Sequence, residues 1–292
     1  MKKSSYLYVF LIFCVSFIFL GCKKSAFFSP ISDQDLSDSF TRKNTKHQVK
    51  RFAFQDYNTR YVEVGNDSLP LLVCLHGSPG SLGSYANFYS DTSFLNHFQL
   101  LIFDRLGYGG SNFGKISTSI ELQADAILPV LKEYKAKKRK IYLVGSSYGG
   151  SVAASVAMKS PELFDAIFFI SSSLIPEQET TYWISYPKPW SFFKKIFPAV
   201  LDFATQEKLT HKQALMPLQN HWAKITCSVG FLHGLDDKLV YFQNVKTASE
   251  KLINAKNIEI YSFEGQGHSL YWNYPDIVKN TLIEFFNKNE IK

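Results

Sequence analysis

The sequence predicts an α/β fold in which helices flank a mostly parallel β-sheet. Short apolar runs recur along the chain without strict alternation, as expected of strands that are buried on both faces. Segments with helical periodicity lie between these runs. Polar, glycine-rich loops follow several of the runs directly. Because strands that alternate with helices pair in parallel, these three observations predict a three-layer sandwich.

Seven strands are expected, and they lie at Tyr61–Val64, Leu71–Leu75, Leu100–Phe103, Ile141–Val144, Ala166–Ile170, Ser228–Leu232 and Ile258–Ser262. Four helices are expected between and after them, at Ser119–Tyr134, Tyr148–Met158, Phe242–Ile253 and Ile277–Asn287. No internal repeat or low-complexity tract interrupts this order. One domain therefore accounts for the greater part of the chain.

The first residues have the pattern of an export signal. Lys2 and Lys3 precede an uncharged, mostly apolar run over Tyr6–Leu20, which suits a signal peptide and is short for a membrane span. The run ends at Gly21-Cys22, which resembles a bacterial lipoprotein cleavage site, although a smaller residue is usual where Leu20 stands. The resemblance implies that Cys22 carries the lipid. An uncleaved anchor helix is the alternative, and both place the domain in the bacterial cell envelope, tied to a membrane.

The chain is accordingly divided into three parts. Residues 1–21 are expected to be a signal peptide. Residues 22–48 are polar and serine-rich without a sustained period, so they are expected to form a tether. Residues 49–292 are expected to form the folded domain.

Composition excludes several classes of protein. The chain has 292 residues, of which 46% are hydrophobic, so it can bury a core and is not a disordered protein. The net charge of +7 is spread along the sequence, which does not favour a nucleic-acid partner. Four cysteines without paired CxxC spacing are neither a disulfide scaffold nor a zinc site. Cys74 is expected to be buried, and its pairing with Cys227 is left open. No metal or organic cofactor is indicated.

Polar loops follow five of the expected strands, at His76–Gly80, Asp104–Ser111, Gly145–Gly150, His233–Lys238 and Phe263–His268. In an open parallel sheet, ligands bind beyond the carboxyl ends of the strands. The five loops are therefore expected to meet at one edge of the sheet and to form the functional site.

Ser147 is the candidate nucleophile. It is the central residue of Gly145-Ser146-Ser147-Tyr148-Gly149, a G-x-S-x-G sequence between an expected strand and an expected helix. Such a turn strains the backbone at the serine, and its glycines let neighbouring segments approach closely. An ordinary glycine-rich turn is the alternative interpretation. The helix that follows is rich in small residues and directs its positive end toward the site.

A serine hydroxyl needs an adjacent base, and that base needs a third group to orient it. His268, which follows the glycine-rich loop after the last expected strand, is the best candidate for the base. His76 and His233 directly follow strands and precede glycines, so they are expected to shape loops by bonding to the backbone. The orienting acid is expected between Ser147 and His268, where Asp236 and Asp237 are adjacent.

Successive side chains in an extended segment point in different directions, so one of these two aspartates is expected to face the histidine. We favour Asp237. The resulting chain order of Ser147, Asp237 and His268 is the order known for hydrolases with a G-x-S-x-G turn.

With these motifs the chain resembles the α/β-hydrolase family, in particular its serine esterase and proline-iminopeptidase group with HG-x-P loops. The resemblance extends from about Phe52 to Phe286 and rests on the five loops given above. In this family the acid stands three residues after the glycine of the HG-x-x-D loop, which is Asp237 here. The family's oxyanion donors correspond to the backbone N–H groups of Ser78 and Tyr148. Members that open epoxides or cleave carbon–halogen bonds have aspartate in place of Ser147, so the resemblance excludes those reactions.

The resemblance also implies a small helical cap over residues 174–222, inserted after the sixth strand of the family's sheet. Its aromatic residues could line an acyl pocket, pack within the cap or contact lipid, and they are Tyr182, Trp183, Tyr186, Trp190, Phe192, Phe193, Phe197, Phe203 and Trp222. An apolar lining would favour esters with apolar groups. Three hypotheses follow: hydrolysis of small or apolar carboxylic esters, removal of amino-terminal residues from peptides with Glu177 or Glu179 holding the substrate amine, or a binding protein without catalysis. The expected partners are a small ester or amide and a membrane.

Overall fold

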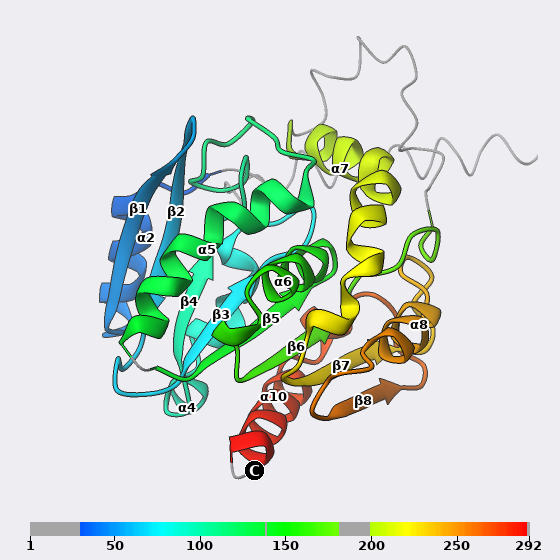
Figure 1. Cartoon of the computed structure of the whole chain (residues 1–292). Helices are drawn as coiled ribbons and strands as arrows, with labels where there is room; N and C mark the ends of the chain where they lie inside the picture. The colour runs from blue at the N-terminus through cyan, green and yellow to red at the C-terminus, as the bar shows by residue number, and fades with distance from the viewer. Residues whose placement is uncertain (1–29, 138, 181–198, 291–292) are drawn as a thin grey trace, which may run out of the picture.

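The computed structural model of the chain describes residues 30–137, 139–180 and 199–290. Its centre is an eight-stranded sheet with the order β1-β2-β4-β3-β5-β6-β7-β8 (Figure 1). Strands β3 to β8 all run parallel to one another, whereas β2 lies antiparallel to both β1 and β4. The expected fold class, a mostly parallel sheet between helices, is confirmed.

The strands are β1 (His47–Phe54), β2 (Tyr57–Val64), β3 (Leu71–Leu75), β4 (Gln99–Phe103), β5 (Ile141–Ser146), β6 (Ala166–Ile170), β7 (Ser228–Gly234) and β8 (Ile258–Phe263). Every residue of β3 to β7 is buried, which explains why these strands appear in the sequence as continuous apolar runs. Strand β1 was not predicted from the sequence. This edge strand is half-exposed and contains several charged and polar residues, so it has no apolar run.

Helices cover both faces of the sheet. The longer ones are α2 (Asp33–Arg42), α5 (Ile120–Ala136), α6 (Tyr148–Lys159), α7 (Ala199–Leu215), α8 (Gln243–Lys251) and α10 (Pro275–Glu290). Short helical segments are η1 (Leu82–Tyr85), α3 (Ala86–Tyr89), α4 (Thr92–Leu95), η2 (Pro161–Leu163), η5 (Met216–Asn220), η6 (Trp222–Lys224) and α9 (Leu270–Asn273). In Figure 1, α5 and α6 cross the face of the sheet that is turned toward the viewer.

Two hydrophobic cores follow from the alternation of side chains along the strands. Val73 and Leu143 belong to the core under α5, α6 and α8. Leu72 and Val144, their neighbours in sequence, belong to the opposite core under α2, α4 and α10. Because successive strand residues point to opposite faces, each strand contributes to both cores. The sheet is thereby held as a rigid platform for the loops at its edge.

The predicted tether over residues 22–48 is wrong for its described part. Residues 33–42 form helix α2, which lies beside β1 (Figure 1). The Ser32 hydroxyl accepts a hydrogen bond from the Asp35 N–H at 3.0 Å, and Ser32 Oγ donates to the Asp35 carboxylate at 2.7 Å. This S-x-x-D capping pattern is a start signal that was present in the sequence. The helix then buries Leu36 and Phe40.

Replacing Phe40 with alanine tests whether α2 belongs to the folded domain. The Phe40 ring is fully buried, with its centroid 5.0 Å from the His47 ring and 4.9 Å from the Tyr89 ring. We expect Phe40→Ala to lower the free energy of unfolding by about 3–5 kcal/mol, as for other buried aromatic truncations. Urea unfolding followed by circular dichroism measures this. The exposed neighbour Thr41 serves as control, since Thr41→Ala should change the free energy of unfolding by no more than about 0.5 kcal/mol. An equally small effect of Phe40→Ala would show that α2 does not stabilise the domain.

The insertion after β6 is mainly helical from residue 199 onward, whereas residues 174–180 contain turns and an isolated β-bridge between Glu179 and Val240. It contains α7, η5 and the start of η6, whereas residues 181–198 lie outside the described residues. Phe203 and Trp222, two of the aromatic residues expected in the cap, are buried in side-chain packing. The other seven, from Tyr182 to Phe197, lie outside the described residues, as do the predicted signal peptide and Cys22.

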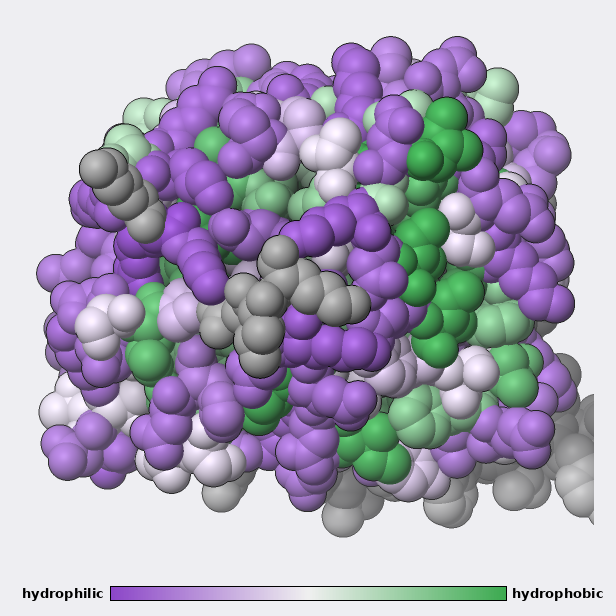
Figure 2. Space-filling view, turned by 60° about the horizontal axis from the view of Figure 1, so that its bottom comes forward, coloured by the Kyte–Doolittle hydropathy of each residue, from purple (hydrophilic) through white to green (hydrophobic). Residues whose placement is uncertain are grey.

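The two described cysteines are not paired with each other. Cys74 is buried in β3 and Cys227 is half-buried, and both are free thiols. Between residues 30 and 290, excluding the undescribed gaps, no helix has the length and apolar character needed to cross a bilayer. Figure 2 shows the side of the molecule that lies at the bottom of Figure 1, where hydrophilic residues predominate and hydrophobic ones gather along one side.

Candidate active site

Ser147 occupies a strained turn between β5 and α6. Its backbone has φ 53° and ψ −123°, a conformation that side-chain-bearing residues rarely adopt. The surrounding backbone holds it there, because its N–H donates to the Ile170 carbonyl at 3.0 Å and its carbonyl accepts from the Gly150 N–H at 3.0 Å. A Cβ atom at Gly149 would lie 2.1 Å from the Leu75 carbonyl oxygen, so only glycine permits this close packing.

The hydroxyl of Ser147 faces a histidine. Although Ser147 precedes the first residue of α6, its side chain does not cap the helix. Its Oγ atom lies instead 3.1 Å from His268 Nε2. The other ring nitrogen, His268 Nδ1, lies 2.7 Å from Asp237 Oδ2. The structure thus brings together Ser147, His268 and Asp237, the three residues that the sequence analysis selected, in one hydrogen-bonded row.

Asp237 is fixed by contacts on both of its carboxylate oxygens. Oδ1 accepts hydrogen bonds from the N–H groups of Leu239 and Val240, both at 2.9 Å. Oδ2 accepts from His268 and lies 3.3 Å from His233 Nε2. The Asp237 side chain has no exposed surface, whereas Asp236 is exposed to solvent. Asp237, not its neighbour, is therefore the carboxylate beside the histidine.

The charge of Asp237 is maintained despite its burial. Burial raises the pKa of this carboxyl, but hydrogen bonds from His233 and His268 outweigh that effect and hold the pKa below its ordinary value. A pKa lower in the folded than in the unfolded state stabilises the fold above the unfolded value of about 4. This contribution is lost as the pH falls through the lower folded-state pKa. In the neutral range Asp237 is an anion that can stabilise positive charge on His268.

His268 is brought to Asp237 by contact between two loops. The Asp236 N–H donates to the Gln266 carbonyl at 2.8 Å, and the Leu235 N–H donates to the Phe263 carbonyl at 2.9 Å. These bonds join the loop after β7 to the loop after β8. They explain how residues 31 positions apart in sequence meet at one edge of the sheet.

His76 and His233 bond to backbone groups, as expected. His76 Nε2 accepts from the Arg105 N–H at 3.0 Å, so its Nδ1 carries the proton and donates to the Gly77 carbonyl at 2.8 Å. Burial and the charge of Arg105 hold the pKa of His76 well below its ordinary value, which keeps this ring neutral. His233 Nε2 donates to the Val240 carbonyl at 2.9 Å.

The expected oxyanion donors lie in segments that flank Ser147. Tyr148 is the first residue of α6, and N–H groups in the first turn of a helix have no acceptor within that helix. Ser78 belongs to the loop after β3, where a cis peptide bond joins it to Pro79. A Cβ atom at Gly77 would lie 2.9 Å from Ser147 Cβ, so this loop passes directly beside the serine. The two segments that contain the expected donors therefore both adjoin Ser147.

A buried ion pair next to this loop was not predicted. Arg105, from the loop after β4, pairs with Glu207 of α7 at 2.7 Å, and neither side chain has exposed surface. Tyr108 donates a hydrogen bond to the same carboxylate at 2.7 Å. Arg105 and Tyr108 belong to a loop that the sequence analysis singled out without assigning them roles. Glu207 lies 102 residues from Arg105, and no local pattern links the two.

The two glutamates considered as holders of a substrate amine are paired with lysines. Glu179 forms an ion pair with Lys208 at 2.7 Å and accepts a hydrogen bond from Ser173 at 2.8 Å. Glu177 forms an ion pair with Lys212. Both lysines come from α7. Each of these carboxylates therefore already has a cation beside it.

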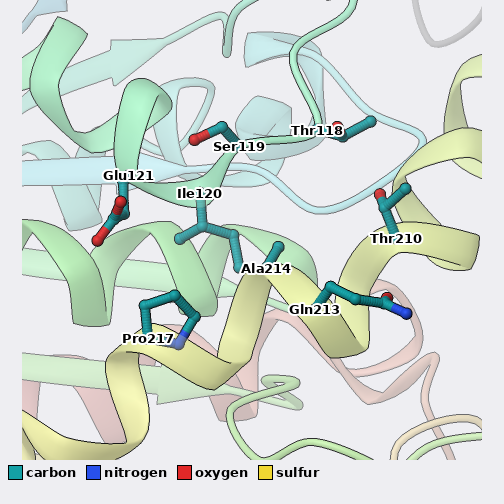
Figure 3. Close-up of a pocket in the computed structure, with 8 residues that line it drawn as sticks. All are labelled: Thr118, Ser119, Ile120, Glu121, Thr210, Gln213, Ala214 and Pro217. Carbon is teal, nitrogen blue, oxygen red and sulfur yellow. The ribbon is translucent and has the colours of Figure 1, made fainter.

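A separate pocket lies between the start of α5 and helix α7 (Figure 3). It is lined by Thr118, Ser119, Ile120, Glu121, Thr210, Gln213, Ala214 and Pro217. None of these residues belongs to the row of Ser147, His268 and Asp237. Among the residues that the structure describes, no cluster of His, Cys, Asp and Glu side chains could hold a metal ion.

Comparison with known proteins agrees with this architecture. A family described as the alpha/beta hydrolase fold matches residues 70–217, just over half of the chain. A Haemophilus influenzae protein named "Putative esterase/lipase" is 22% identical, and the match covers 94% of this chain and 99% of that protein.

Two further similarities cover different extents of the chain. A proline iminopeptidase of Lactobacillus acidophilus is 32% identical over 106 residues, which are 35% of this chain and 36% of that enzyme. The crystal structure of a membrane phospholipase A, described as a bacterial virulence factor, covers 99% of both chains with a TM-score of 0.63 and 15% identity. At this level of identity the structural likeness concerns the fold alone.

Proposed function

This chain belongs to the α/β-hydrolase family, and from that premise we propose that it is a serine hydrolase of carboxylic esters. The observation that carries the proposal is the hydrogen-bonded row in which His268 lies 3.1 Å from Ser147 Oγ and 2.7 Å from Asp237. A nucleophile, a base within hydrogen-bond reach and a group that orients the base are the requirements of covalent serine catalysis.

The reaction proceeds through an acyl-enzyme. Ser147 Oγ attacks the ester carbonyl while His268 Nε2 accepts the hydroxyl proton. His268 then gives that proton to the departing alcohol, and Asp237 stabilises the imidazolium that exists between these steps. Water, activated by the same histidine, releases the acid and restores the Ser147 hydroxyl.

The negative charge that develops on the carbonyl oxygen needs donors that are already in position. The N–H groups of Tyr148 and Ser78 fill this role in the proposed reaction. The amino terminus of α6 adds partial positive charge from the aligned peptide dipoles. By analogy with a measured case, each donor of this kind contributes about 3–4 kcal/mol to lowering the barrier.

Esters are favoured over peptides by two observations. The similarity to the Haemophilus influenzae protein extends over nearly the whole chain, whereas the similarity to proline iminopeptidase covers about a third of it. Glu177 and Glu179 are each paired with a lysine, so neither is a free anion for a substrate amine. Removal of amino-terminal residues remains the second candidate because the identity within that third reaches 32%.

A fluorophosphonate probe and a substrate panel test the proposal. We expect the probe to label the folded chain at Ser147, as identified by mass spectrometry of the labelled peptide. We also expect higher kcat/KM for short-chain p-nitrophenyl esters than for aminoacyl p-nitroanilides.

Each alternative predicts a different result. Faster cleavage of the anilides would replace the ester proposal with an aminopeptidase. Absence of labelling in the folded chain would favour a binding protein that lacks catalysis.

A further inference from the structure

Glu207 of helix α7 is connected through the Arg105 side chain to the loop after β3, which passes beside Ser147. Glu207 accepts two hydrogen bonds from the Arg105 guanidinium, Nη1 to Oε1 at 2.7 Å and Nη2 to Oε2 at 3.1 Å. Gln123 of α5 also donates to Glu207, at 3.2 Å. Because both partners of the ion pair are fully buried, Arg105 depends on Glu207 as its counter-ion.

Arg105 holds the backbone of the loop after β3 at two consecutive residues. Its Nε donates to the His76 carbonyl at 2.8 Å, and its Nη2 donates to the Gly77 carbonyl at 3.1 Å. The guanidinium carbon lies 4.6 Å from the ring centroids of both Tyr108 and Tyr148. The guanidinium therefore has little freedom to move relative to the loop that it holds.

Tyr108 connects the same carboxylate to the side chain of Ser78. The Tyr108 hydroxyl donates its only proton to Glu207 Oε2 at 2.7 Å. Its oxygen lies 2.9 Å from Ser78 Oγ, so the Ser78 hydroxyl is the donor in that contact. Glu207 thus reaches Ser78 through one intervening hydroxyl and reaches Gly77 through one guanidinium.

The position of this loop relative to the nucleophile follows from these contacts. Gly77 passes beside Ser147 so closely that an added Cβ would lie 2.9 Å from Ser147 Cβ. A displacement of the loop changes the distance between the Ser78 N–H and the reacting carbonyl. Misplacement of a catalytic group by about 1 Å can lower a rate by about 100-fold.

We propose that Glu207 is a positioning residue for the reaction at Ser147, acting through Arg105 and Tyr108 on the loop that contains Ser78. The inference rests on the proposed serine-hydrolase function and deepens it. Helix α7 thereby helps to fix the geometry of the site. Glu207, which is distant in sequence from all the strand-end motifs, controls the position of the proposed oxyanion donor at Ser78.

Two variants test this role. We expect Glu207→Gln to lower kcat for a p-nitrophenyl ester by about 10- to 100-fold while KM stays close to the wild-type value, because the oxyanion forms only in the transition state. Tyr108→Phe keeps the ion pair between Arg105 and Glu207 and removes the hydroxyl that links Glu207 to Ser78, with its hydrogen bonds to both residues. We expect it to lower kcat by about fivefold, which corresponds to about 1 kcal/mol.

The control variant lies on the same helix. Lys212→Gln removes the exposed ion pair with Glu177 and should leave kcat and KM unchanged. A trifluoromethyl ketone, which forms a tetrahedral adduct with the serine, provides a readout that a merely structural role would not move. Its inhibition constant should rise in both test variants in proportion to the loss of kcat/KM, and the double variant should be no worse than Glu207→Gln alone.

Wild-type kcat and wild-type inhibition by the ketone in Tyr108→Phe and in folded Glu207→Gln would overturn the positioning role. If Glu207→Gln fails to fold, Tyr108→Phe alone decides. These outcomes are distinct from failure of the proposed function, because fluorophosphonate labelling of Ser147 in the wild-type chain is measured alongside. Absence of that labelling would overturn the hydrolase proposal, and the positioning role with it.

Discussion

Replacing Ser147 with alanine is expected to lower kcat for ester hydrolysis by about 10⁴- to 10⁶-fold, the range found when the nucleophile of a serine triad is removed. The variant keeps the hydrogen bond between His268 and Asp237 and lacks only the attacking oxygen. Substrate binding and the backbone donors remain, so the residual rate should still exceed the rate of uncatalysed ester hydrolysis in water. Initial rates with a short-chain p-nitrophenyl ester at neutral pH measure the loss.

The neighbouring serine provides a matched control. Ser146 is the last residue of β5 and is buried, and the proposed mechanism gives its hydroxyl no role. Ser146→Ala should therefore retain a kcat within the same order of magnitude as the wild-type chain. Equal activity of Ser147→Ala and the wild-type chain would contradict the assignment of the nucleophile, and circular dichroism of both variants checks that they fold.

The second large effect is expected from Asp237→Asn, which should lower kcat by about 10⁴-fold, as the equivalent change does in a measured triad. Asparagine has nearly the same shape, but it lacks the negative charge that stabilises the protonated histidine. Its amide can also donate to His268 Nδ1, which leaves the proton on Nε2, where the nucleophile needs an acceptor. The ester assay at neutral pH measures the effect.

The adjacent carboxylate of Asp236 provides a matched control for this prediction. Asp236 is exposed and Asp237 is buried against His268, so Asp236→Asn should change kcat little. The opposite result, with Asp236 required and Asp237 dispensable, would contradict the proposed row of residues. Because the pKa of Asp237 lies below its ordinary value, protonation of this carboxylate does not explain any loss of activity in mildly acidic buffer.

Local sequence patterns were informative where structure is local. Five of the seven runs that predicted strands lie in the fully buried strands β3 to β7, because a strand buried on both faces is apolar at most positions. The other two lie in β2 and β8, which are partly exposed. The patterns failed for β1, an edge strand with exposed positions, and for α2, which has only Leu36 and Phe40 as buried residues. The S-x-x-D sequence at Ser32 could have indicated the start of α2.

The contacts around Glu207 could not have been predicted in this way. Arg105, Gln123 and Glu207 come from three separate elements, and their pairing depends on how α7 packs against the sheet. The structural roles of His76 and His233 were expected from their places at strand ends. Their actual acceptors, Gly77 and Val240, follow from the folding of the loops.

The sequence by itself determined the fold class and the chemical character of the loops at the sheet edge, because periodicity is local and parallel strands bring their carboxyl ends together. It also placed the candidate serine, the adjacent pair Asp236 and Asp237, and the candidate histidine in that order along the chain. Only the tertiary structure decided that Asp237 rather than Asp236 faces the histidine, that residues 33–42 pack on the sheet, and that Glu207 of α7 joins Arg105. These outcomes depend on contacts between distant segments, whose distances and burial arise only when the chain is packed.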